Sequence, residues 1–138
     1  MEFPWKKLRK RSIDGIDDLS LAIVQDSETN EILMVAFTNE EALNKTLNTG
    51  EMHYYSTTKR RIWRKGESSG NVQKVDEIYI DCDGDAVLFR VRQRGGACHN
   101  GYKSCFYRKF DMNKGDFIIV GRRVFNPERI YKNKNKKL

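Results

Sequence analysis

Short runs of apolar residues recur along this chain, separated by polar segments, and their lengths are typical of strands. Residues 22–26 and 32–37 read as two strands, and the polar segment Ser27–Glu31 between them predicts a turn. Three further segments have the composition of short strands, namely 52–56, 62–64 and 117–120.

One segment has helix signals at both ends. Thr38 is the predicted N-cap, because Glu41 follows three residues later at the spacing of a capping box. Gly50 stands where a glycine commonly ends a helix. The sequence therefore predicts one clear helix between Thr38 and Gly50.

Residues 78–82 and 86–91 predict two strands on either side of Asp83-Gly84, a dipeptide typical of hairpin turns. No internal repeat or linker is visible. We expect an α+β, β-rich fold: a single small domain with a mixed, barrel-like sheet and one main helix. We place this domain at residues 1–131 and expect 132–138 to be a basic, disordered tail.

The chain of 138 residues is long enough for one core, and its 11% aromatic content argues against disorder. No segment approaches the roughly 20 apolar residues that cross a bilayer. The N-terminus lacks the apolar run of a signal peptide. We therefore expect a cytoplasmic protein with no membrane partner.

A net charge of +7 favours an anionic partner. Lys and Arg concentrate in 6–11, 59–65 and 132–137, and we expect the two terminal runs to be solvated. The middle run is interleaved with an aromatic residue and followed by a glycine-serine loop, which suits a nucleotide or its phosphates. It supplies these candidate substrate contacts: Lys59, Arg60, Trp63, Arg64, Lys65, Ser68 and Ser69.

All three cysteines, Cys82, Cys98 and Cys105, lie close together in the sequence. An odd number of thiols in a reducing compartment argues against disulfides, and the absence of a C-x-x-C pair argues against structural zinc. Three ligands with one open position are typical of catalytic zinc. His99 could ligate the metal or deprotonate its water, whereas His53 reads as structural. The alternatives are small buried cysteines and a hydrogen-bonded histidine.

Asp81, Asp83 and Asp85 alternate along the chain, so in an extended strand they would share one face while Cys82 points to the other. Three neighbouring carboxylates repel one another unless a cation neutralises them, and oxygen ligands suit magnesium or calcium. The segment is not an EF-hand loop, because position 12 is Arg92. The alternative is a tight turn with solvated carboxylates.

Three motifs in this order are highly specific: D-C-D-x-D at 81–85, G-A-C-H-x-G at 96–101 and S-C-F-Y at 104–107. With weaker similarity upstream, they make the chain resemble the phosphoribosyl-AMP cyclohydrolase family of histidine biosynthesis from about residue 20 to residue 107. The chain departs from that family at 56–59, where Ser-Thr-Thr-Lys replaces Ser-Arg-Ser-Arg, so Lys59, Arg60 or Arg61 could replace a missing cation.

The resemblance implies a cytoplasmic homodimer that hydrolyses the N1–C6 bond of the adenine ring in 1-(5-phosphoribosyl)-AMP. The product would be the phosphoribosyl-formimino-AICAR nucleotide, in the third step of L-histidine biosynthesis. It also implies one zinc per subunit on Cys82, Cys98 and Cys105, shared across the dimer, and a zinc-activated water with His99 as the catalytic residue. One magnesium per subunit would bind Asp81, Asp83 and Asp85.

Two other functions fit parts of the sequence. A zinc-dependent nucleobase deaminase performs similar chemistry, but its H-x-E and P-C-x-x-C motifs are absent. A small basic RNA-binding module would suit the pI of about 9.4, yet no RRM or KH signature is visible. RNA binding also leaves the cysteine and aspartate motifs unexplained, so we expect a nucleotide substrate and no nucleic-acid partner.

Overall fold

The computed structural model describes residues 1–130, so the expected basic tail at 132–138 lies outside the described residues. The elements in chain order are η1 (Trp5–Lys7), β1 (Arg11–Ile13), β2 (Ile16–Asp26), β3 (Ile32–Thr38), α1 (Glu40–Thr49), β4 (His53–Ser56), β5 (Arg61–Arg64), β6 (Gln73–Ile80), β7 (Ala86–Gln93), β8 (Arg108–Asp111) and β9 (Asp116–Ile119). Within this described part, no helix is long and apolar enough to cross a membrane.

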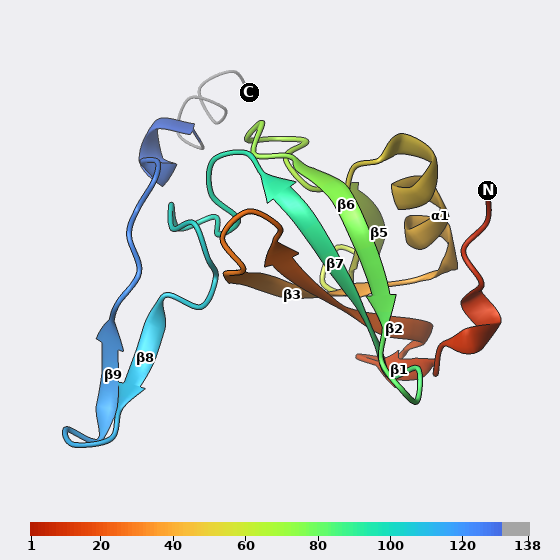
Figure 1. Cartoon of the computed structure of the whole chain (residues 1–138), viewed down its shortest axis with the longest axis horizontal. Helices are drawn as coiled ribbons and strands as arrows, with labels where there is room; N and C mark the ends of the chain where they lie inside the picture. Colours follow the sequence, from red (N-terminus) through yellow and green to blue (C-terminus); the bar gives the residue numbers. More distant parts are fainter. Residues whose placement is uncertain (131–138) are drawn as a thin grey trace.

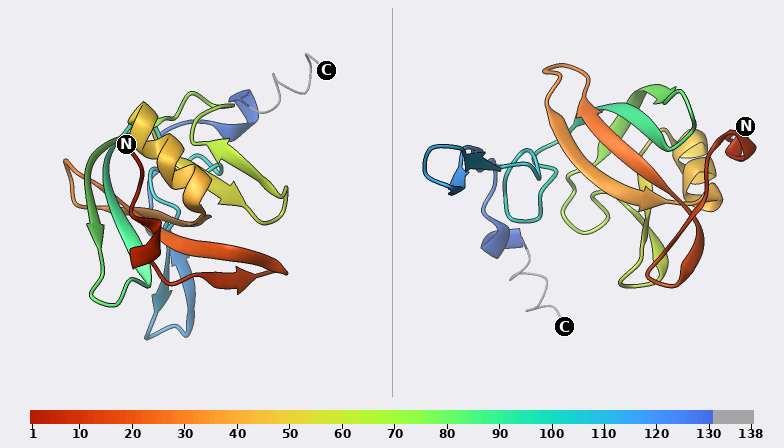
Figure 2. Two further views of the ribbon diagram at one scale, coloured as in Figure 1. Left: turned by 90° about the vertical axis from the view of Figure 1, so that its right-hand side faces the viewer. Right: turned by 90° about the horizontal axis from the view of Figure 1, so that it is seen from below.

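The main sheet has the strand order β5-β4-β3-β2-β7-β6, with β1 paired to β2 off this path. Strand β2 pairs with β3 antiparallel and with β7 in parallel, so the expectation of a mixed sheet is confirmed. The sheet curls into a half-barrel, and α1 packs near one end of it (Figures 1 and 2). The expected small, strand-rich α+β fold is also confirmed.

The core forms where alternate residues of two adjacent interior strands, β2 and β7, point to the same side. Ala22 and Val24 of β2 and Val87, Phe89 and Val91 of β7 are all buried. Their neighbours along each strand are more exposed, which is the period of two that a strand with one buried face requires. Burial of this apolar face fixes the register of the sheet, because a slip by one residue would expose it.

The helix begins one residue later than the sequence predicts. Thr38 is not the N-cap, because it is the last residue of β3 and pairs there with Ser20. Asn39 caps α1 instead, and its side-chain oxygen accepts a hydrogen bond from the Ala42 N–H at 2.9 Å. The predicted stop is confirmed: Gly50 adopts a left-handed conformation, with φ 76°, and donates to the Thr46 carbonyl.

The β6–β7 hairpin has a five-residue connection, 81–85, rather than a two-residue Asp-Gly turn. An Asp81 carboxylate oxygen accepts a hydrogen bond from the Ala86 N–H, and β6 ends at Ile80, two residues before the predicted end at Cys82. The carbonyl of Gly84 accepts a hydrogen bond from the Arg9 N–H at 2.9 Å. Gly84 has φ 76°, and a side chain there would overlap the Lys7 carbonyl, so glycine allows the N-terminal segment to pack against this turn.

Strands β8 and β9 form a separate two-stranded sheet that projects away from the main sheet (Figure 1). The sequence predicted a strand near β9 but not β8. Phe110 and Phe117 contact each other edge to face across the hairpin, yet they and Ile119 remain exposed. This hairpin therefore contributes little to the core.

Candidate functional site

An open pocket of about 500 Å³ lies between β3, the β4–β5 hairpin and the glycine-serine loop at 66–70. His99 and Cys105 also line it. Arg60 is not among the lining residues; it lies in the β4–β5 turn, in a left-handed conformation with φ 54°. The other six candidate substrate contacts all line the pocket: Lys59, Trp63, Arg64, Lys65, Ser68 and Ser69.

Two further charged residues line the pocket, Arg61 and Glu67. Arg61 is one of the three possible replacements for the cation missing from the family pattern, whereas Glu67 had no expected role. A guanidinium nitrogen of Arg61 lies 2.9 Å from a Glu67 carboxylate oxygen. Burial would raise the pKa of Glu67. Hydrogen bonds from the Arg61 side chain and the Arg64 backbone N–H, together with the charges of both arginines, outweigh burial and hold the pKa of Glu67 below its usual value. The Arg64 guanidinium pairs with Glu51 at 2.9 Å. Both arginines are therefore positioned by carboxylates at the pocket wall.

Two of the three cysteines meet beside the pocket. Cys98 is buried, Cys105 is half-buried, and their side chains lie close enough for Cys98 to act on the Cys105 thiol. Burial and the neighbouring Cys98 raise the pKa of the Cys105 thiol to about 11, and Lys65 lowers it only in part. In the protein alone Cys105 is therefore a neutral thiol at pH 7, and a bound metal ion would be needed to hold it as a thiolate.

Lys65 faces this thiol pair rather than the open side of the pocket. Its ammonium donates a hydrogen bond to the Ala97 carbonyl and lies 5.7 Å from the centroid of the Trp63 ring. Burial lowers the pKa of Lys65, while Cys105 and Cys98 act in the opposite direction. Lys65 therefore differs from the pocket arginines, whose partners are carboxylates.

Cys82 lies at the opposite end of β7. It is exposed in the turn that precedes β7, whereas Cys98 comes after this strand of eight residues has ended. At about 3.3 Å per residue, the strand alone separates the two positions by roughly 25 Å. One chain therefore does not bring its three thiols together. Among residues 1–130, the set of three potential metal ligands that does converge is Asp81, Asp83 and Asp85.

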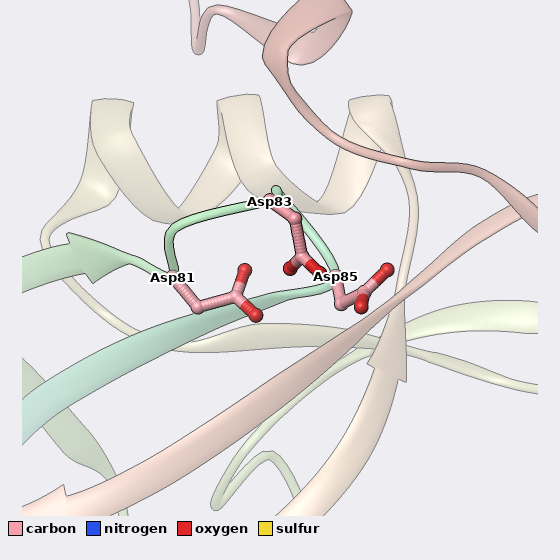
Figure 3. A group of neighbouring side chains, drawn as sticks. All are labelled: Asp81, Asp83 and Asp85. Carbon is pink, nitrogen blue, oxygen red and sulfur yellow. The ribbon is translucent and has the colours of Figure 1, made fainter.

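The three aspartates surround the β6–β7 turn, and their ligand atoms lie within 4.8 Å of one another (Figure 3). The expectation that an extended strand places them on one face is wrong, because a turn brings them together. Asp85 forms ion pairs with Arg11 at 2.5 Å and with Arg9 at 3.7 Å. Asp81 and Asp83 are exposed, so a cation could reach them while Arg11 competes for Asp85.

The two histidines have different surroundings. His99 is exposed and lines the pocket directly after Cys98, within reach of a bound ligand. His53 is buried, its backbone N–H donates to the Thr46 hydroxyl at 2.9 Å, and its ring Nδ1 lies 2.9 Å from the Glu51 carbonyl oxygen. His53 is not among the residues that line the pocket, which agrees with its structural interpretation.

The segment between Cys98 and Cys105 is fixed to the β2–β3 turn. The Lys103 ammonium lies 3.2 Å from carboxylate oxygens of both Asp26 and Glu31. The Cys105 N–H donates to the Leu33 carbonyl at 2.7 Å. These contacts hold the position of Cys105, so the geometry of the thiol pair depends on the end of β2.

The fold and the site together are those of a small α+β enzyme with a cationic pocket and two sets of side chains that suit metal ions. The sequence profile of phosphoribosyl-AMP cyclohydrolase matches residues 34–107, which include the pocket and both sets. The chain belongs to the phosphoribosyl-AMP cyclohydrolase family, whose members are hydrolases. The β8–β9 hairpin lies beyond the matched residues.

Individual relatives are similar over most of the chain. The phosphoribosyl-AMP cyclohydrolase of Methanothermobacter thermautotrophicus is 54% identical over 125 residues, which are 88% of each chain. Its namesake from Methanocaldococcus jannaschii is 58% identical over 114 residues, which are 83% of this chain and 87% of the relative. The comparisons give no support to the deaminase or to the RNA-binding module.

We predict that the free energy of unfolding depends on the ionisation of Asp26. Burial would raise its pKa, but the N–H groups of Glu28 and Thr29 and the Lys103 ammonium outweigh burial and lower it. The stabilisation is therefore present above the unfolded pKa of about 3.9 and is lost as the pH falls through the lower, folded pKa. At pH 7, Asp26→Asn should lower the free energy of unfolding by about 1–3 kcal/mol.

Urea unfolding at a series of pH values measures this effect. The difference between wild type and Asp26→Asn should be constant from about pH 5 to 8 and should shrink below about pH 4. Asp14→Asn is the control, because Asp14 is exposed and its side chain forms no hydrogen bond or ion pair within residues 1–130. A difference that persists unchanged at low pH would contradict the role of the Asp26 carboxylate.

Proposed function

We propose that the chain is a phosphoribosyl-AMP cyclohydrolase. It hydrolyses the N1–C6 bond of the adenine ring in 1-(5-phosphoribosyl)-AMP and gives the phosphoribosyl-formimino-AICAR nucleotide, as the third step of L-histidine biosynthesis in the cytoplasm. The observation that carries the proposal is the match of the family to residues 34–107, supported by relatives more than 50% identical over most of the chain.

The pocket suits a substrate with two phosphate groups. Its volume of about 500 Å³ is in the usual range for small-molecule sites. Lys59, Arg61 and Arg64 supply cations at its wall, and Trp63 supplies an aromatic surface. Because Arg61 and Arg64 already pair with carboxylates, bound phosphates would compete with Glu67 and Glu51 for them.

The thiol pair fits one zinc ion per subunit. Cys98 and Cys105 lie close together, Cys98 buried and Cys105 half-buried at the pocket, and thiolates are typical zinc ligands. When bound, zinc would supply a Lewis acid that activates water at neutral pH. We assign proton transfer to His99, because it lies at the pocket directly after a zinc ligand and an imidazole can exchange protons near pH 7.

The third thiol, in our proposal, comes from a second copy of the chain. The length of β7 keeps Cys82 away from Cys98 and Cys105 of its own chain. A two-fold axis would bring the Cys82 of each subunit to the thiol pair of the other and create two equivalent sites. Ile80 and Phe106, which flank Cys82 and Cys105, are 44% and 57% exposed, as residues that become buried in an interface would be.

The aspartate turn fits one magnesium ion per subunit, because its three carboxylates converge and are accessible. Asp81 and Asp83 are the immediate neighbours of Cys82 in the sequence. If Cys82 of one subunit joins the Cys98–Cys105 pair of the other, Asp81 and Asp83 of the first subunit come to that same shared site. The dimer would therefore place both metal ions at one pocket, although a single chain holds the two ligand sets apart.

The direct test is a ring-opening assay with 1-(5-phosphoribosyl)-AMP, combined with metal analysis of the same sample. We predict about one zinc per chain in the wild type, from the single thiolate set. Cys98→Ser should lose zinc and activity together, because it removes a buried ligand. Circular dichroism should verify that the variant is folded. A zinc-free Cys98→Ser protein with full activity would rule out the zinc assignment.

We predict that the aspartate turn acts independently of zinc. Asp83→Asn should lower activity by at least about tenfold, because it weakens the oxygen ligand set, while zinc content stays near the wild-type value. Asp14→Asn is a matched control, since Asp14 is also an exposed aspartate in a turn. If Asp83→Asn lost zinc in proportion to activity, the two ions would not have separate sites.

We predict that two inactive variants restore activity when they form a heterodimer. In a pair of Cys82→Ser and Cys105→Ser subunits, one shared site lacks two cysteines and the other is intact, by two-fold symmetry. Heterodimers isolated with two affinity tags should recover up to about half of the wild-type activity. Each parent homodimer is the control. No recovery in verified heterodimers would mean that the zinc site is not shared.

A further inference from the structure

Lys65 is fixed in place by its backbone and by its side chain. It follows β5, and its backbone N–H donates to the Met52 carbonyl at 3.0 Å. The side chain passes the Trp63 ring, and its ammonium donates to the carbonyl of Ala97. Ala97 is buried and directly precedes Cys98. The ammonium is therefore attached to the segment that carries a zinc ligand and His99.

The charges around Lys65 are unusual for a pocket cation. Arg61 and Arg64 each have a carboxylate partner, whereas among residues 1–130 no carboxylate lies within ion-pair distance of the Lys65 ammonium. The ionisable groups that act on it are the thiols of Cys105 and Cys98. A half-buried ammonium needs a nearby negative charge or hydrogen-bond acceptors to offset its lost hydration. The Ala97 carbonyl supplies only one neutral acceptor.

The proposed zinc site supplies the missing negative charge. Three thiolates and one divalent ion together carry one net negative charge, which a single ammonium balances. Without the ammonium, that charge would lose the Lys65 cation that acts on both Cys98 and Cys105. The position of Lys65 against both Cys98 and Cys105 is therefore the position that a charge-balancing residue requires.

We propose that Lys65 is a positioning residue of the metal site: its ammonium balances the zinc-thiolate charge, and its hydrogen bond to Ala97 orients the segment bearing Cys98 and His99. This inference rests on the zinc part of the proposed function. It replaces the expectation from sequence that Lys65 contacts the substrate. The cations left for substrate phosphates are then Lys59, Arg61 and Arg64.

The test compares zinc affinity in three Lys65 variants, measured by competition with a chromophoric chelator. Lys65→Met removes the charge and the hydrogen-bond donor, and we expect zinc binding about 10- to 100-fold weaker, the range seen when groups that support metal ligands are removed. Lys65→Arg keeps both and should bind zinc more tightly than Lys65→Met. Lys65→Gln keeps a donor without the charge, so it separates the two roles and provides a second test if Lys65→Met does not fold.

Lys59→Met is the matched control, because Lys59 lines the same pocket but is exposed. Its zinc affinity should stay within about twofold of wild type, since a solvated charge is largely screened. Cobalt-loaded protein gives a second readout. Loss of the nearby positive charge makes the thiolates better electron donors, so the thiolate-to-cobalt band should move to longer wavelength in Lys65→Met and Lys65→Gln but not in Lys59→Met.

Wild-type zinc affinity and an unshifted cobalt band in both Lys65→Met and Lys65→Gln would overturn this inference and leave the zinc site intact. A wild-type chain that binds no zinc would overturn the proposed metal centre and the role of Lys65 with it. Equal losses of zinc affinity in Lys65→Met and Lys59→Met would also overturn the inference, because they would show that zinc binding depends on the total charge of the pocket and not on the position of Lys65.

Discussion

Strand β7 is an interior strand of the main sheet, paired in parallel with β2 and antiparallel with the edge strand β6. Its buried residues, Val87, Phe89 and Val91, tie it to the core, so it can neither bend sharply nor slip. The aspartate turn with Cys82 is attached to its beginning, and Cys98 follows its end. Because of this separation, one chain holds the aspartate turn with Cys82 apart from the pair Cys98 and Cys105, and this is the reason for proposing a dimer that would bring these two halves of the proposed metal site together.

The two halves are held by different interactions. The thiol half depends on the end of β2, where Lys103 pairs with Asp26 and Glu31, and on β3, where Leu33 accepts the Cys105 N–H. The aspartate half depends on the N-terminal segment, which reaches the turn through Gly84 and Asp85. Each half is therefore fixed by contacts between segments far apart in the sequence, before any second chain or metal ion is present.

Charge pairing divides the cations of the pocket into two kinds. Arg61 and Arg64 are held by carboxylates that an anionic ligand can replace, whereas Lys65 is directed at the thiols. The carboxylates of Glu67 and Glu51 already hold the two arginine side chains in place. A phosphate that replaced these carboxylates would bind side chains that are already ordered, so less conformational entropy would be lost on binding. The same short run of sequence thus serves the ligand at one end and the proposed metal site at the other.

The sequence by itself determined the family, the strand-rich α+β class and the Gly50 helix stop, because motifs and turn chemistry are local. It misplaced the N-cap at Thr38, since only the pairing of Thr38 with Ser20 shows that β3 still includes it. Its expectation of an extended aspartate segment failed because a local hydrogen bond from the Ala86 N–H to Asp81 closes a turn, and because the Lys7 carbonyl packs on Gly84 in a tertiary contact that the local pattern does not reveal. Tertiary structure alone decided that Cys98 and Cys105 meet while Cys82 does not, and that Lys65 faces thiols, because residue types do not encode distances across a sheet.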